Sequence, residues 1–347
     1  MKKILKTTQP YITSYQGIAN LLTILQNYPS TKHWIFNNYI QLIYYENINN
    51  NYLHNMTGAF FDLETGIPLI GHYSYCPFMH TAQMDREVMH SGWSSFLEFI
   101  KALVDLDYYI MMWLNQTYIP CSSDYLKKHG ENPILIYGYD DQEKIIYTTG
   151  FYRDGKFGFE TIHYLDILQA EKNLINPNEY IQTILTARYN NNLTFPFDMS
   201  EFLLFLNDYL YSKDHTNRFY YIKDKKYFYG LMYYDKLIEQ VLMQKKCDIR
   251  LLHILVDHKI MMGYRLEYFK SENILASKQF HMLYKTNETL IRETTIIQNF
   301  AMKQNYTSTS GFWEDHALLI FKKKVKQLKK ADRLFTKKLY DTLKNHL

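Results

Sequence analysis

Residues able to do nucleophilic or metal chemistry are sparse in this chain. Its three cysteines, Cys76, Cys121 and Cys247, lie far apart and form no Cys-x-x-Cys pair. An odd and widely spaced set argues against a disulfide framework and for a reducing compartment. We therefore expect a cytoplasmic protein.

One group of residues has the spacing of metal ligands on a helix. His72, Cys76 and His80 fall four residues apart, which would align them on one helical face. Pro77 interrupts such a helix, and no fourth ligand lies nearby. We therefore predict no metal site and no cofactor.

The elements that would position a site begin with a helix near the N-terminus. Thr13 or Ser14 is the expected N-cap, and apolar residues recur at helical spacing from Ile18 to Leu25, before Pro29. Ser14 could therefore serve as a helix cap or as a hydroxyl nucleophile.

The next elements form an antiparallel meander. Residues 134–137 are apolar with β-branched members, which predicts a strand buried on both faces. Gly138 ends this run and residues 140–142 supply a polar turn, while Gly155 marks a second turn where a positive φ is expected. The expected order is a strand at 134–137, a strand at 144–149, a strand at 157–162 and a helix at 164–170.

This meander resembles a known superfamily. Its runs read NPILIYGYDD, IIYTTGF and GKFGFETIHYLDILQA. They resemble the sheet half of the papain-like, peptidase-C39-like superfamily. Within it they are most similar to bacterial proteins related to the butirosin-biosynthesis acyltransferase, often encoded beside nonribosomal peptide synthetases. The resemblance covers about residues 105–170 and implies an α+β papain-like cysteine-protease fold, with an antiparallel sheet packed on helices.

The resemblance also implies where a catalytic site would lie. Papain-like proteins carry a nucleophilic Cys at the start of the first long helix, and this family carries a His where the first meander strand opens. The matching residues here are Thr13, Ser14 or Tyr15 on the helix and Asn132 on the strand. The residue that orients the imidazole would fall at 149–150, which are Thr and Gly. These positions supply no thiol, imidazole or carboxylate.

Two functions of different classes follow from these departures. The first is a degenerate papain-like pseudoenzyme, an accessory or binding partner in nonribosomal peptide or polyketide biosynthesis. The second is an active acyl- or amide-transfer enzyme that acts on carrier-protein-bound thioesters with non-standard catalytic residues. Cys121 and His129, just ahead of Asn132, are the candidates for a displaced Cys–His dyad.

The later part of the chain is predicted to be helical. Residues 248–265 leave one polar stripe on an apolar helix, formed by Arg250, His253, Asp257 and Arg265. Buried charges must be satisfied internally, so we expect Arg250 and Asp257 to pair in a network that locks helices together. The alternative is that the stripe binds an anionic group.

The chain ends in a basic amphipathic helix at residues 321–347. Its apolar line is formed by Val325, Leu328, Phe335 and Leu339, and Lys and Arg residues surround this line. A solvated face accounts for these charges, and an acidic acyl or peptidyl carrier protein is the partner we expect if they bind one. We predict no nucleic-acid partner, because the helix lacks interleaved aromatic residues, and no transmembrane helix.

Composition sets the remaining limits. The chain is 47% hydrophobic and 21% charged, which is typical of a globular protein with a sizeable core, and its net charge of +4 is too small to imply nucleic acid. Helical patterning is expected at 179–188, and residues 34–46 fit a helix or a strand.

The expected domains are a papain-like domain at 1–172, a connecting helical region at 173–230 and an α-helical domain at 231–347.

Overall fold

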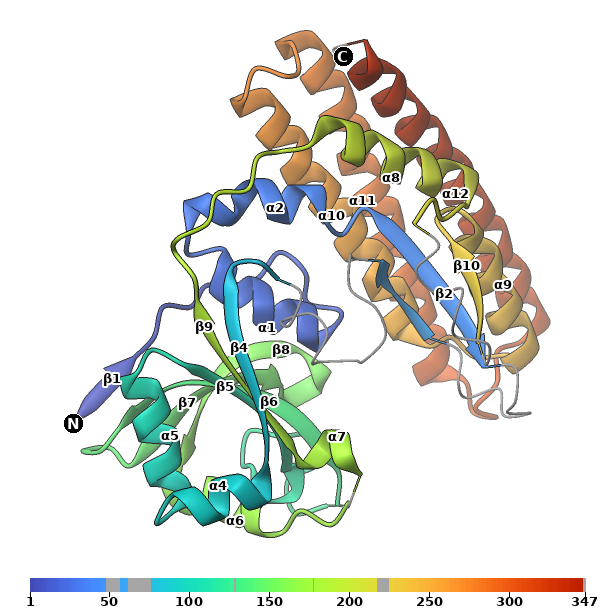
Figure 1. Ribbon diagram of the computed structural model, residues 1–347. Helices are drawn as coiled ribbons and strands as arrows, with labels where there is room; N and C mark the ends of the chain where they lie inside the picture. Colours follow the sequence, from blue (N-terminus) through green and yellow to red (C-terminus); the bar gives the residue numbers. More distant parts are fainter. Residues whose placement is uncertain (48–56, 62–75, 128, 177, 217–224, 346–347) are drawn as a thin grey trace. The chain divides into compact units, whose positions relative to one another are not determined.

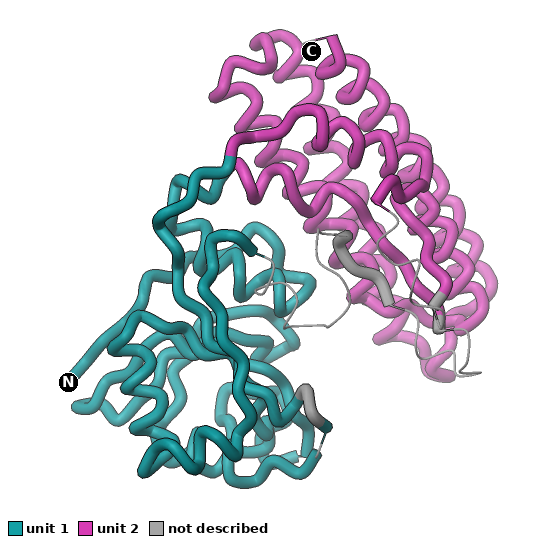
Figure 2. Tube along the Cα trace, in the orientation of Figure 1, with its two compact units in different colours: residues 1–32, 66–195 teal, residues 33–65, 196–347 magenta. Residues whose placement is uncertain are grey.

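A computed structural model of the chain describes residues 1–47, 57–61, 76–127, 129–176, 178–216 and 225–345. It divides into two compact units, one formed by residues 1–32 and 66–195 and the other by 33–65 and 196–347 (Figure 2). The units interleave in sequence, whereas the expected regions were three consecutive ones with boundaries at 172 and 230. Residues 33–65 belong to unit 2 because they supply a helix and two strands to it.

Within the described residues, unit 1 is built on a seven-stranded antiparallel sheet (Figure 1). Its order is β4-β9-β5-β6-β7-β8, and β1 pairs with β6 beside this path. The strands are β1 (Lys2–Ile4), β4 (Met79–Asp85), β5 (Tyr109–Asn115), β6 (Glu131–Asp140), β7 (Ile145–Phe151), β8 (Phe157–His163) and β9 (Thr183–Tyr189).

The predicted meander is confirmed as β6, β7 and β8, and β6 is buried from Pro133 to Asp140. The sequence suggested that Gly138 ends the strand, but the strand continues beyond it. It lies inside β6 at a register shift, where a Cβ would come 2.7 Å from the Lys3 carbonyl oxygen. A glycine is needed there because β1 packs directly against that backbone.

The helices of unit 1 are α1 (Gln16–Leu25), α4 (Arg86–Gly92), α5 (Phe96–Asp105), α6 (Tyr164–Lys172) and α7 (Glu179–Gln182), with short 3-10 turns at Pro29–Thr31, Gln116–Tyr118 and Arg153–Gly155. Helix α1 is buried along its whole length and packs on β7, as the sequence predicted. The predicted helix at 179–188 is wrong after Gln182. Strand β9 follows because Ile184 and Thr186 are β-branched and buried between β4 and β5.

Unit 2 combines a three-stranded sheet, in the order β10-β2-β3, with long helices (Figure 1). Its elements are α2 (Lys32–Asn37), β2 (Gln41–Asn47), β3 (Thr57–Phe61), α8 (Met199–Tyr211), β10 (Lys225–Tyr229), α9 (Met232–Gln244), α10 (Ile249–Ser271), α11 (Ser277–Thr307) and α12 (Asp315–Lys344). Helices α10, α11 and α12 pack in succession, and α12 also contacts α8 and α9. The segment 34–46 is therefore helix first and strand afterwards.

Helix α12 confirms the predicted amphipathic C-terminal helix and begins six residues earlier than expected. The predicted apolar line is buried at Val325, Leu328, Phe335 and Leu339. Among the described residues, no helix combines the length and apolar character needed to cross a bilayer.

Candidate functional site

The start of helix α1 is where the sequence resemblance would put a nucleophile. The helix begins at Gln16, and Tyr15 is its N-cap residue in place of the predicted Thr13 or Ser14. Thr13, Ser14 and Tyr15 are all half-buried. The first side chain that the helix itself directs at the sheet is therefore an amide.

Gln16 connects α1 to the first strand of the meander. Its Nε2 donates a hydrogen bond to the carbonyl oxygen of Pro133 in β6, and the side chain is buried. The start of the helix and the start of β6 thus lie side by side. The contact joins an amide to a backbone carbonyl, and neither group titrates near neutral pH.

One helical turn further along, Asn20 makes the second contact with the sheet. Its Oδ1 accepts a 2.8 Å hydrogen bond from the Thr149 hydroxyl, and its Nδ2 lies 3.7 Å from the Met111 sulfur. Asn20 and Thr149 are both fully buried. Gln16 and Asn20 share a helical face because they are four residues apart.

The remaining members of this polar group surround Gly150. The Tyr152 hydroxyl forms a 2.6 Å hydrogen bond with the Thr148 hydroxyl. A Cβ placed on Gly150 would lie 3.3 Å from that Tyr152 oxygen and 3.5 Å from Gln16 Nε2, so both side chains converge on this glycine. We call Gln16, Asn20, Thr148, Thr149 and Tyr152 the amide cluster.

The amide cluster has no group that could act as a base near neutral pH. Burial raises the pKa of Tyr152 well above its ordinary value, so its phenol remains protonated. Amides and aliphatic hydroxyls do not ionise in this range, and a hydroxyl nucleophile needs an adjacent base. The cluster can hold and orient polar groups through hydrogen bonds, but it cannot deprotonate a nucleophile.

The displaced candidates Cys121 and His129 do not form a dyad. Burial raises the pKa of the Cys121 thiol to about 12, which opposes formation of a thiolate. His129 is exposed, and its Nδ1 lies 3.0 Å from Nδ2 of Asn115, an amide that also donates to the Asn173 carbonyl. No hydrogen bond joins Cys121 to His129 in the described part of the chain.

Asn132 and the residues considered as metal ligands complete this inventory. Asn132 is exposed in β6, opposite Leu114. Cys76 is buried, His80 is exposed in β4, and His72 lies outside the described residues. The described residues contain no group of three or more His, Cys, Asp or Glu side chains that could hold a metal ion.

The polar stripe of α10 is arranged differently from the prediction. Arg250 pairs with Asp248, the N-cap residue, at 2.5 Å, and its side chain is 82% exposed. The predicted pair of Arg250 and Asp257 is therefore wrong, because the Arg250 guanidinium binds the carboxylate of Asp248, two residues earlier in the chain. Asp257 lies 3.8 Å from His253, and Arg265 is fully buried and donates to the Phe36 and Asn38 carbonyls.

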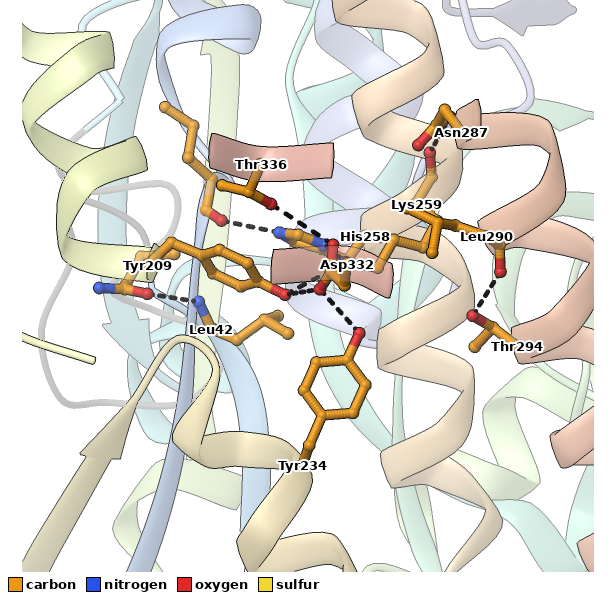
Figure 3. A network of polar contacts seen from close by, with 12 residues as sticks. Leu42, Tyr209, Tyr234, His258, Lys259, Asn287, Leu290, Thr294, Asp332 and Thr336 are labelled. Carbon is orange, nitrogen blue, oxygen red and sulfur yellow. Dashed lines mark hydrogen bonds and ion pairs between the residues drawn. The ribbon is translucent and has the colours of Figure 1, made fainter. Parts of the chain in front are cut away.

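Unit 2 contains a second buried polar network, centred on Lys259 and Asp332 (Figure 3). The two charges lie 2.6 Å apart, and each side chain is 1% exposed. The Lys259 ammonium also lies 3.1 Å from the Tyr209 hydroxyl and 3.0 Å from His258 Nδ1. Its three protons therefore have three acceptors.

The other members of this network fix the protonation of His258 and satisfy Asp332. His258 Nε2 lies 2.8 Å from the Ile40 carbonyl, so it carries the proton and leaves Nδ1 to accept from Lys259. Burial, the largest cause, and the Lys259 charge lower the pKa of His258, which keeps the ring neutral. Asp332 also accepts from the Tyr209 and Tyr234 hydroxyls. The side chains of this network are buried, and it joins the helices that carry them.

Gln16, Asn20 and Asp332 were not among the residues predicted from the sequence. The signal for the first pair was present, since two amides four residues apart share one face of a largely apolar helix. Asp332 stands among lysines in the sequence, and its burial depends on tertiary packing. Comparisons with protein-family models and with curated proteins found no match to this chain.

Proposed function

We propose that this chain is a degenerate papain-like protein without catalytic activity that binds a partner in specialised-metabolite biosynthesis. The observation that carries this proposal is the amide cluster. Its position corresponds to the helix and strands that the resemblance associates with catalysis, and its side chains are neutral. A protein that retains such a framework without the thiol and imidazole can still bind what an active relative would process.

The partner we propose is an acidic acyl or peptidyl carrier protein. Support comes from the exposed face of α12, where cationic residues recur at alternating spacings of three and four. These residues are Lys323, Lys326, Lys330, Arg333 and Lys337, and all five are exposed. We call them the basic stripe.

The geometry of the basic stripe favours a macromolecular partner. From Lys323 to Lys337 it covers about 21 Å of helix, which exceeds the size of a small ligand. These five side chains have no ion pair with a described residue, whereas Lys329 beside them pairs with Asp235. A row of unneutralised charges of one sign steers association with an oppositely charged surface.

The experiment is a binding titration of fluorescently labelled acidic carrier protein against the wild-type chain and a charge-reversal variant. The variant carries Lys326→Glu, Lys330→Glu and Arg333→Glu on the basic stripe. We expect at least a tenfold loss of affinity, equivalent to about 1.4 kcal/mol, and a weaker dependence on salt.

The matched control carries Lys278→Glu, Lys285→Glu and Lys303→Glu, three exposed cations of α11. It makes the same change in net charge, so we expect close to wild-type affinity. Equal losses in the two variants would contradict a specific basic stripe, and absence of binding by the wild-type chain would contradict the carrier proposal.

A further inference from the structure

Unit 1 contains a cavity of about 510 Å³ that the amide cluster does not reach. It lies between β1, Tyr28 beyond the end of α1, the start of β5 and the segment 188–192 at the end of β9. Gln16 stands at the other end of α1, so the two places are separate. The volume falls within the range of small-molecule sites.

Contacts between lining residues hold several walls of this cavity in place. The Tyr109 hydroxyl donates a 2.6 Å hydrogen bond to the Lys6 carbonyl, and the Lys3 ammonium lies 2.8 Å from an Asp107 carboxylate oxygen. The rings of Tyr28 and Tyr189 stack with centroids 3.5 Å apart and planes 5° apart. The cavity is therefore preformed, which lowers the entropy cost of binding.

The charges that line the cavity do not balance. Lys3 and Asp107 neutralise each other, and Asp107 is the one carboxylate among the described lining residues. The Lys6 ammonium lies 6.0 Å from the centre of the Tyr28 ring, and the Arg188 guanidinium 5.0 Å from that of Tyr108. Neither cation forms an ion pair with a described residue, so about two positive charges remain.

The sheet register places a histidine beside Arg188. His80 in β4 is paired directly with Arg188 in β9, and both side chains are exposed. The imidazole of His80 can therefore hydrogen-bond to a ligand that Arg188 binds.

We propose that this cavity binds a small phosphate monoester with a hydroxyl-rich body. A phosphate monoester is close to a dianion near neutral pH, which matches the charge left by Lys6 and Arg188. The Arg188 fork can contact two phosphate oxygens at once. Asn190, Asn191 and Asn192 line the same cavity, and amide side chains can hydrogen-bond to hydroxyl groups, although the Asn190 oxygen already accepts from the Asn192 backbone N–H. This inference stands independently of the proposed carrier partner.

The test is calorimetric titration of the full chain at low ionic strength with ribose 5-phosphate, inorganic phosphate and gluconate. We expect ribose 5-phosphate to bind more tightly than inorganic phosphate, and gluconate, a monoanion, to bind most weakly. Arg188→Ala should weaken ribose 5-phosphate binding at least tenfold, and Lys6→Ala severalfold. Lys156→Ala, an exposed cation of unit 1 that does not line the cavity, should leave binding unchanged.

Each contrary result has a definite meaning. Absence of binding by ribose 5-phosphate would overturn the proposal, and so would equal losses in Arg188→Ala and Lys156→Ala, which would show unspecific attraction. Gluconate binding as tight as ribose 5-phosphate would overturn the choice of phosphate. Should Arg188→Ala fail to fold by circular dichroism, Lys6→Ala decides the outcome, because the Lys6 side chain is exposed.

Discussion

Replacing Asp332 by Asn tests how the buried network stabilises unit 2. The substitution keeps the size of the side chain and removes the charge that faces Lys259 at 2.6 Å. Lys259 would then remain buried opposite a neutral amide, and breaking a buried ion pair in this way costs about 3–5 kcal/mol. The Tyr209 and Tyr234 hydroxyls keep the Asn oxygen as an acceptor, so the loss reports mainly on charge.

The size of this loss should depend on pH. Burial lowers the pKa of Lys259 in the folded protein, and the Asp332 charge opposes that shift. In the Asp332→Asn variant the pKa of Lys259 in the folded chain is lower still, while in the unfolded chain its pKa is about 10.4. Between those two values the unfolded chain binds more protons, so the stability of the variant rises with pH. The deficit should shrink by up to about 1.4 kcal/mol per pH unit.

Urea denaturation followed by far-UV circular dichroism at about pH 7 and about pH 9 measures both effects. Asp341→Asn is the matched control, because Asp341 is an exposed carboxylate on the same helix. We expect the control to change the free energy of unfolding by less than about 0.5 kcal/mol. A loss below about 1 kcal/mol in Asp332→Asn, or a deficit that grows with pH, would refute the reasoning.

Further predictions concern three buried positions. Gly138→Ala should lower the free energy of unfolding by about 1–3 kcal/mol, because the new Cβ would lie 2.7 Å from the Lys3 carbonyl oxygen. Gly158→Ala is the control, since a Cβ there would have no atom within 4 Å. Equal denaturation midpoints for the two variants would contradict this prediction. Arg265→Met should cost about 1–3 kcal/mol, since two buried carbonyls lose their donors, and an unchanged midpoint would contradict it. Iodoacetamide at neutral pH should modify Cys121 much more slowly in the folded chain than in urea, because burial raises its pKa to about 12; equal rates by mass spectrometry would count against burial.

Local pattern predicted much of unit 1. The apolar β-branched run at 134–137 and the turn glycine Gly155, with φ +64, were sufficient for the meander. The interruption of α7 by β9 could not be foreseen, because residues 183–188 become a strand only by pairing between β4 and β5. Strand formation there is a tertiary effect, which overrides helical spacing.

The position of the first helix was predicted better than the side chains that contact the sheet. Helical spacing located this helix within two residues. Thr13, Ser14 and Tyr15 were the residues expected at the start of this helix, whereas the side chain that contacts β6 is Gln16. A helix start is uncertain by one or two residues from sequence, and one residue turns a side chain by about 100°. The predicted pair of Arg250 and Asp257 was wrong because Arg250 binds the N-cap carboxylate of Asp248.

Turnover of a carrier-bound acyl thioester, followed by mass spectrometry, tests the central claim most directly. The absence of a base in the amide cluster and the raised pKa of Cys121 predict that wild type releases or transfers no more acyl group than a protein-free control. Ser14→Ala and Cys121→Ala should then behave like wild type. Turnover by the wild-type chain that disappears in either variant would contradict the account and identify that residue as the nucleophile.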